Sequence, residues 1–157
     1  MTRPTRAVEP WTLVPLDKFV GEAGVRLVLL MTPAGQVLAQ HGFTRAVDVM
    51  SAAALGAAIV SSSREIARMI DGRPVATLNH QGARHGVFLA AFATPREPLL
   101  VLAVYGPDSS IGLVQLFFEH LVSDLQAACP PPETRKLVLA ADFERELNDS
   151  LAALFGR

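Results

Sequence analysis

A helix-length stretch at residues 45–71 constrains the fold of this chain most, because the middle of the stretch carries no charge. Between Val49 and Ser63 the residues are mostly Ala, Ser and Gly. A helix without a charged side is usually covered along much of its circumference. We therefore interpret this stretch as a helix in close contact with other backbone on more than one side.

At 100° per residue, the stretch separates into two faces. The face that we expect to lie on a sheet holds Leu55, Ile59, Ser62, Ile66, Met69 and Ile70. The opposite face is smooth and becomes basic at its end, and it holds Met50, Ala53, Ala57, Val60, Ser61, Arg64 and Arg68. An exposed helix face is normally charged throughout, so we predict that this second face contacts another chain. The alternative is a helix buried on both sides within one domain.

Length and composition favour one well-covered domain. A chain of 157 residues can bury a sizeable core as a single domain. Charged residues make up 18% of the chain, below the usual value of about a quarter, while apolar residues reach 50%. More of the surface is therefore covered than a monomer needs. The net charge of -1 provides no field that attracts nucleic acid or anionic lipid, so a nucleic-acid partner is disfavoured.

The single cysteine, Cys129, excludes an internal disulfide and suits a reducing compartment. No base near it in the sequence could activate a thiol, so we expect a structural role. Charged residues at positions 9, 17 and 18 interrupt any apolar segment behind the N-terminal arginines, which argues against a signal peptide. No uncharged run is long enough to span a bilayer. We expect a cytoplasmic protein without membrane insertion.

Periodicity and turn residues divide the remaining chain into helices and strands. Residues 1–12 are expected to form a flexible lead. Helices are predicted at residues 13–23, 45–71 and 111–128, and strands at residues 25–32, 36–40, 75–80, 85–93 and 99–105. Thr44 is the expected N-cap of the long helix, and Asp108 or Ser109 that of the helix after the last strand. The order α-β-β-α-β-β-β-α over residues 13–128 predicts an α/β sandwich with a five-stranded antiparallel sheet.

The C-terminal segment is predicted to be a separate, tethered helix. Three consecutive prolines within residues 129–136 form a stiff spacer. In the amphipathic helix predicted at residues 137–157, one side is lined by Leu139, Phe143, Leu147, Leu151, Leu154 and Phe155. Docking on the chain's own domain and docking in a partner's groove would bury this stripe equally well, so both remain open.

Residues that could support catalysis are sparse. His80 and His85 flank a turn at Gly82, but no third and fourth metal ligand follow at a recognisable spacing, so solvated turn histidines are the simpler interpretation. The chain contains no G-x-x-x-x-G-K phosphate loop and no evident pair of nucleophile and base. We expect no catalytic residue, cofactor or metal site in this chain.

Three segments resemble the roadblock family of dynein light chain relatives. They are the hairpin VRLVLLMTPAGQVLAQHG, the small-residue helix VDVMSAAALGAAIVSSSREIARMI and the meander that begins VATLNHQGARHGVFLAAF. The resemblance covers residues 13–128. The proline spacer with the helix LAADFERELNDSLAALFG is similar to the bacterial MglB subgroup of that family.

The resemblance implies a homodimer in which the long middle helices lie side by side and the two sheets join. Such a dimer forms a platform for a small Ras-like GTPase, and the smooth helix face falls where that platform would be. MglB-like proteins activate an MglA-type GTPase in cell polarity and gliding motility by rearranging the partner's own catalytic groups. Arg64 and Arg68 are then expected to be charge partners rather than an arginine finger. The terminal helix is expected to reach a second GTPase surface and influence nucleotide exchange.

Two other functions remain as alternatives to a GTPase activator. A roadblock scaffold would hold a GTPase or another complex without accelerating hydrolysis. A small-molecule sensor would need an interior cavity, but Leu27, Leu29, Phe88 and Phe92 are expected to fill the interior.

Overall fold

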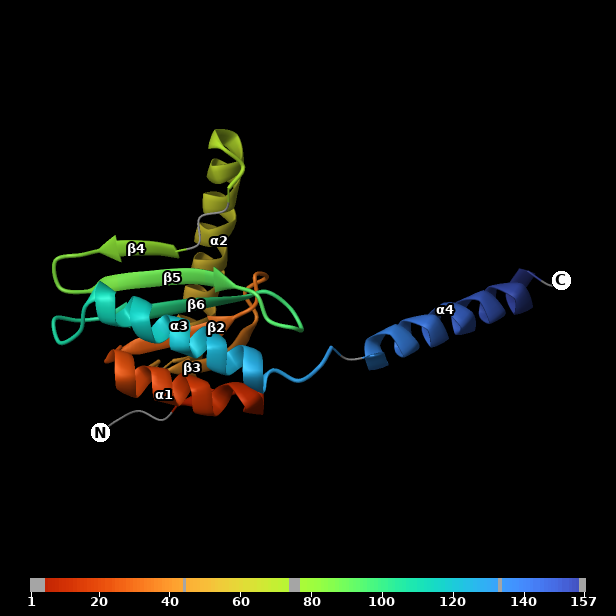
Figure 1. Cartoon of the computed structure of the whole chain (residues 1–157). Coiled ribbons are helices and arrows are strands. Elements are labelled where there is room, and N and C mark those ends of the chain that lie inside the picture. Colours follow the sequence, from red (N-terminus) through yellow and green to blue (C-terminus); the bar gives the residue numbers. More distant parts are fainter. Residues whose placement is uncertain (1–4, 44, 74–76, 133, 156–157) are drawn as a thin grey trace.

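The computed structural model describes residues 5–43, 45–73, 77–132 and 134–155, without the side chains of residues 46, 47 and 134–141. Its centre is a six-stranded antiparallel sheet with the strand order β1-β3-β2-β6-β5-β4 (Figure 1). The strands are β1 (Arg6–Ala7), β2 (Leu27–Met31), β3 (Val37–His41), β4 (Thr77–Gln81), β5 (Gly86–Phe92) and β6 (Leu99–Tyr105). The helices are η1 (Pro10–Thr12), α1 (Leu13–Ala23), α2 (Ala46–Ile70), α3 (Ile111–Ala128) and α4 (Thr134–Phe155).

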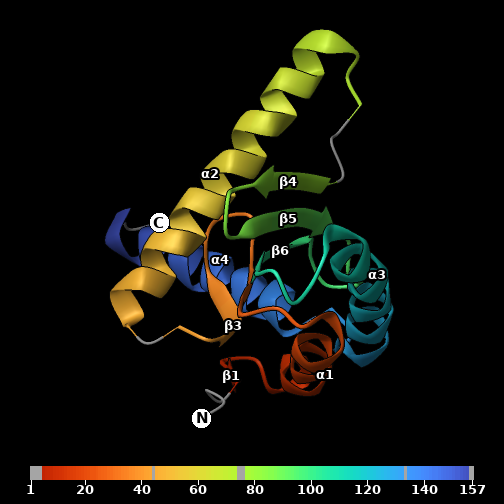
Figure 2. The same cartoon turned by 90° about the vertical axis from the view of Figure 1, so that its left-hand side faces the viewer.

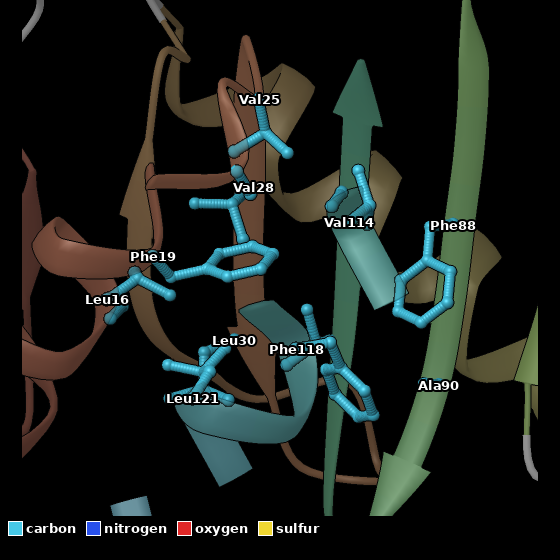
Figure 3. Packing of buried hydrophobic residues seen from close by; sticks show 14 of the residues in the cluster. Leu16, Phe19, Val25, Val28, Leu30, Phe88, Ala90, Val114, Phe118 and Leu121 are labelled. Atoms are coloured by element: carbon cyan, nitrogen blue, oxygen red, sulfur yellow. The ribbon is translucent and has the colours of Figure 1, made fainter. Parts of the chain in front are cut away.

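The sheet lies between two helical layers. Helices α1 and α3 lie side by side on one face, and α2 crosses the other face (Figures 1 and 2). Each face has its own apolar core, and Figure 3 shows Phe19, Phe88 and Phe118 pointing into the core beneath α1 and α3. The predicted α/β sandwich is therefore confirmed.

The central strands β2 and β6 are apolar on both faces, as the sequence predicts for strands that are covered on both sides. In β2, Val28 and Leu30 belong to the core beneath α1 and α3, whereas Leu29 and Met31 belong to the core beneath α2. All four side chains are fully buried. This alternation fixes the register of the sheet, because a slip of one residue would exchange the two cores.

Two residues of the expected flexible lead form a strand. Arg6 and Ala7 form β1, which pairs with Gln40 and Ala39 of β3 and adds a sixth strand to the predicted five. The backbone N–H of Val8 also donates to the carbonyl of Leu38 at 2.8 Å. A strand of two residues is too short to show a hydrophobic period, so the sequence pattern could not predict it.

Two predicted helix caps have different outcomes. Thr44 lies outside the described residues, and the N-cap of α2 is Arg45, whose backbone is extended. The N-cap of α3 is Ser110 rather than Asp108 or Ser109, because the Ser110 hydroxyl accepts a hydrogen bond from the Leu113 backbone N–H at 3.3 Å. Any of these polar side chains could serve as a cap, so sequence alone did not select among them.

The side of α2 that was predicted to lie on the sheet is exposed in the structure, and another side packs on the sheet. The side that packs on the sheet carries small residues, including Ala53, Gly56 and Val60, and not the large apolar ones. A Cβ on Gly56 would lie 2.6 Å from Met31 Cε and 3.2 Å from Leu102 Cδ1. The helix therefore lies so close to the sheet that large side chains cannot fit between them.

Helix α4 stands away from the rest of the molecule (Figure 1). It begins at Thr134, three residues before the predicted start, and its described side chains are exposed. None of the helices in the described part of the chain is long and apolar enough to cross a membrane.

Candidate functional site

Helix α2 extends beyond the edge of its own sheet. It runs across the strands and continues past β4, the last strand of the sheet, so its C-terminal turns project from the body (Figures 1 and 2). In these turns the exposed fractions of Ile66, Met69 and Ile70 are 59%, 80% and 77%. Burying such side chains is worth roughly 1.5–3 kcal/mol each, so their exposure indicates an unfilled contact.

One side of α2, which we term the apolar flank, contains the large residues that were expected to lie on the sheet. The members of the apolar flank are Leu55, Ile59, Ile66, Met69 and Ile70, all exposed. Most are spaced by four or seven residues, which places them in one row along the helix. Contiguous exposed apolar surface of this kind marks interaction sites in folded proteins.

The other side of α2, which we term the arginine flank, contains four of the seven residues predicted to face another chain. These four, Met50, Ser61, Arg64 and Arg68, are exposed. The structure does not bring Ala53, Ala57 and Val60 together with them: Ala53 and Val60 are buried on the sheet, and Ala57 is half-buried against the same core. Contact of these seven residues with a second chain remains a prediction.

The charges of the arginine flank lie at the surface. Arg68 Nη1 is 3.2 Å from Glu65 Oε2, and both side chains are more than half exposed. An exposed ion pair three residues apart on a helix contributes little to folding stability. Forming or exchanging this pair costs little, so Arg68 can engage a partner.

The edge strand β4 adjoins α2 and carries exposed residues at four of its five positions. Leu78 is the exception and packs on the core beneath α2. In the described part of the chain, β5 is the one strand that β4 pairs with, which leaves the other side of β4 available for a further strand. The residue pattern of the sequence predicts a strand here but does not indicate its place in the sheet, so its edge position could not be foreseen.

The predicted stripe of α4 is accessible over its described length. Phe143, Leu147, Leu151, Leu154 and Phe155 are all exposed, whereas the side chain of Leu139 lies outside the described part of the chain. An amphipathic helix with an uncovered stripe is suited to bind an apolar groove. Its docking partner remains a prediction.

His85, one of the two turn histidines, has a partner unlike those of a metal site. The guanidinium of Arg26 donates from Nη1 to Nε2 of His85 at 3.1 Å, and from Nη2 to Oδ1 of Asp108 at 3.2 Å. A backbone hydrogen bond and then Arg26 hold the pKa of Asp108 below its ordinary value. A cation at His85 Nε2 would face the positive guanidinium, and the described residues contain no group of three candidate ligands.

Two hollows among the described residues of the body lie at its surface. One, of about 340 Å³, lies between the turn after β4 and the start of α3 and is lined in part by Arg84, Tyr105 and Ser109. The other, of about 520 Å³, lies beside Thr5 and Val14. Of the residues expected to fill the interior, Leu29 and Phe88 are fully buried, and Leu27 and Phe92 are half-buried.

Comparison of sequences identifies a family. The family model described as Roadblock/LC7 domain matches residues 13–103. A curated protein of Aquifex aeolicus (strain VF5), described as uncharacterized, is 31% identical over 114 residues, which are 71% of this chain and 68% of that protein. The family-model match covers α1, α2, the strands β2 to β5 and most of β6.

Comparison of structures finds the same fold in three MglB structures. Myxococcus xanthus MglB has a TM-score of 0.66 at 22% identity, covering 74% of this chain and 92% of that chain. The gliding protein MglB of Thermus thermophilus has a TM-score of 0.65 at 21% identity, covering 76% and 88%. A structure described as MglB with tetrameric arrangement has a TM-score of 0.64 at 22% identity, covering 74% and 86%.

Proposed function

The chain belongs to the Roadblock/LC7 domain family, and from that membership we propose that it is a homodimeric regulator of a small Ras-like GTPase. Its partner is an MglA-type GTPase in the cytoplasm, in a system of cell polarity or gliding motility. The chain acts as a GTPase-activating protein that rearranges the partner's own catalytic residues, and it has no active site of its own. The fold shared with MglB proteins supports this assignment.

The exposed apolar flank of α2 is the observation that carries the homodimer. A two-fold axis beside β4 would set two copies of α2 antiparallel along their apolar flanks. The C-terminal turns of each α2, which project past β4, would then lie over the sheet of the other copy. The open side of β4 would meet its own copy, so the two sheets would join. Both kinds of contact come from one symmetric arrangement, and a similar MglB is itself described as tetrameric.

The arginine flank remains available after such a dimer has formed, because it lies on the other side of the buried stripe. Arg64 and Arg68 give this flank positive charge near one end. A partner surface that carries acidic groups fits this charge. Rim charges of this kind affect association rate and salt dependence more than final affinity. We expect the double variant Arg64→Glu/Arg68→Glu to bind the GTPase more slowly, with a weaker dependence on salt.

Helix α4 would supply a second contact with the GTPase. Its stripe is exposed, and the proline spacer gives it reach from the end of α3. Removing residues 136–157 should leave a folded dimer with altered GTPase affinity or nucleotide exchange. A truncated chain that fails to fold would show instead that α4 is part of the core.

Multiple-turnover GTP hydrolysis tests the proposal directly. The Ras-like GTPase encoded nearest to this chain would be assayed with and without the full-length protein. Acceleration is the expected result, and it should be weaker in the Arg64→Glu/Arg68→Glu variant, which associates more slowly. An unchanged hydrolysis rate, measured under conditions where the two proteins bind, would assign the chain to the scaffold class.

A further inference from the structure

The edge strand β4 needs a reason for keeping a regular strand conformation. It has five residues, mostly polar, and the one strand it pairs with in the described part of the chain is β5. Edge segments with few buried apolar contacts open easily, and β4 has Leu78 as its contact with the core beneath α2. A strand that must present a regular edge to another copy needs more support than this.

Tyr105 supplies that support from two strands away. It ends β6, its side chain is 3% exposed, and its hydroxyl lies 2.9 Å from Asn79 Oδ1 and 3.1 Å from Gln81 Oε1. Asn79 and Gln81 are alternate residues of β4, so they project to the same face of the sheet. The hydroxyl has one proton to donate, and either amide oxygen can accept it.

Gly86 makes this long contact possible. Gly86 of β5 lies in register between Tyr105 of β6 and Gln81 of β4. A Cβ at this position would lie 2.6 Å from Tyr105 Cε1 and closer still to the hydroxyl end of the ring. The missing side chain leaves a channel across β5 that the tyrosine ring fills. A glycine within a strand is otherwise destabilising, so its presence here has a packing reason.

We propose that Tyr105, lying over Gly86, is a positioning residue that holds β4 ready to pair with β4 of a second copy. The hydroxyl fixes β4 from the α1 and α3 side of the sheet, while Leu78 fixes it from the α2 side. The backbone N–H and C=O groups on the open side of β4 are then ordered before association, which lowers the entropy lost on pairing. This inference rests on the proposed homodimer.

Hydrogen exchange of the full-length chain with Tyr105→Phe tests the positioning role of Tyr105, because the variant retains the ring and loses only the hydroxyl. Loss of this hydrogen bond should make the β4 amides exchange about fivefold to tenfold faster. The β2 amides should change less than about twofold, and the dimer dissociation constant should rise about fivefold to tenfold. Equal acceleration in β2 and β4 would reveal a general loss of stability and overturn the proposal. Unchanged β4 exchange, or an unchanged dissociation constant, would also overturn it.

A double-mutant cycle and a monomeric background separate this proposal from the homodimer itself. In an Asn79→Ala/Gln81→Ala chain, Tyr105→Phe should have no further effect on β4 exchange, because the acceptors are gone. His80→Ala is the matched control on the same strand and should leave β4 exchange unchanged. Ile66→Asp, in the apolar flank, should give a monomer in which Tyr105→Phe still accelerates β4 exchange. If the wild-type chain proves monomeric, the proposed homodimer is wrong. If Tyr105→Phe does not accelerate β4 exchange in the Ile66→Asp monomer, only the positioning role of Tyr105 is wrong.

Discussion

Helices α2 and α3 pack on opposite faces of the same sheet with opposite side-chain sizes. Helix α3 buries large residues, including Phe118 and Leu121, whereas α2 buries Ala53 and Gly56. The sheet compensates on each side. The buried strand residues beneath α1 and α3 mix the small Ala39, Ala90 and Ala103 with larger ones such as Leu30 and Phe88, whereas those beneath α2 are all large: Leu29, Met31, Leu89, Leu100 and Leu102.

This comparison teaches that volume is matched across each helix–sheet contact, as close packing requires. A small-residue helix face therefore indicates a sheet face with large side chains, and it does not by itself indicate contact with another chain. The large apolar residues of α2 are then surplus to its own core. These exposed apolar side chains, more than the small-residue face, indicate an interface on this helix.

Truncation of Phe118 should have the largest effect on this comparison. Its ring makes edge contacts with Phe88 and Phe92 at centroid distances of 5.2 and 5.9 Å. Phe118→Ala should lower the free energy of unfolding by about 3–5 kcal/mol, because the alanines of the sheet cannot fill the cavity. Urea denaturation measures the loss. Leu116→Ala, on the exposed side of α3, should cost much less, and equal losses would contradict the size matching.

Enlargement of Gly56 should be the next most damaging change. Gly56→Leu places a large side chain where Met31 and Leu102 already fill the space, and overpacking of this kind costs about 1–3 kcal/mol. The same denaturation experiment measures it. Ala58→Leu, at an exposed position of α2, is the matched control and should be nearly neutral. Tolerance of Gly56→Leu would mean that α2 can move away from the sheet.

Some elements could be predicted to the residue because punctuating residues flank them. The helix at residues 13–23 ends before Gly24, whose φ of +65° suits a C-cap glycine. The strand at residues 99–105 lies between Pro98 and Gly106, and the helix at residues 111–128 ends before three prolines, and all three match the structure. Local chemistry determined these ends, so the sequence carried the information.

The orientation of α2 could not be predicted, because a period identifies two faces without saying which one is inside. The inward face of α2 is determined by Met31 and Leu102, which are distant from α2 in the sequence and contact Gly56 only in the folded chain. The same reason hid the Tyr105 contact with Asn79, which joins residues 26 positions apart across an intervening strand. Gly86 was the one visible sign, as a glycine in an apolar strand.

A charge placed in the apolar flank tests whether the exposed apolar side chains of α2 form an interface. Ile66→Asp should weaken self-association more than tenfold, because the carboxylate would be buried without a partner in the dimer. Light scattering over a concentration series measures the assembly. The thermal unfolding midpoint of the monomeric form should change little, since Ile66 is 59% exposed. Leu113→Asp, at an exposed apolar position of α3, is the matched control, and equal loss of assembly from both variants would contradict a specific α2 interface.

A pH dependence should arise on the α1 side of the sheet and be the smallest effect. His41 faces that side, and its Nδ1 lies 2.9 Å from Thr5 Oγ1, which donates to Asp17 Oδ1 at 2.9 Å. Burial lowers the pKa of His41 below its ordinary 6.5, and the Asp17 carboxylate opposes this only in part. The folded state then binds fewer protons than the unfolded state, so stability is fully present above pH 6.5 and falls as the pH drops below that value. Urea midpoints at neutral and mildly acid pH should show this decrease, and His41→Gln should reduce it. If the urea midpoint of His41→Gln decreases on acidification as much as that of the wild type, His41 is not the source of the pH dependence.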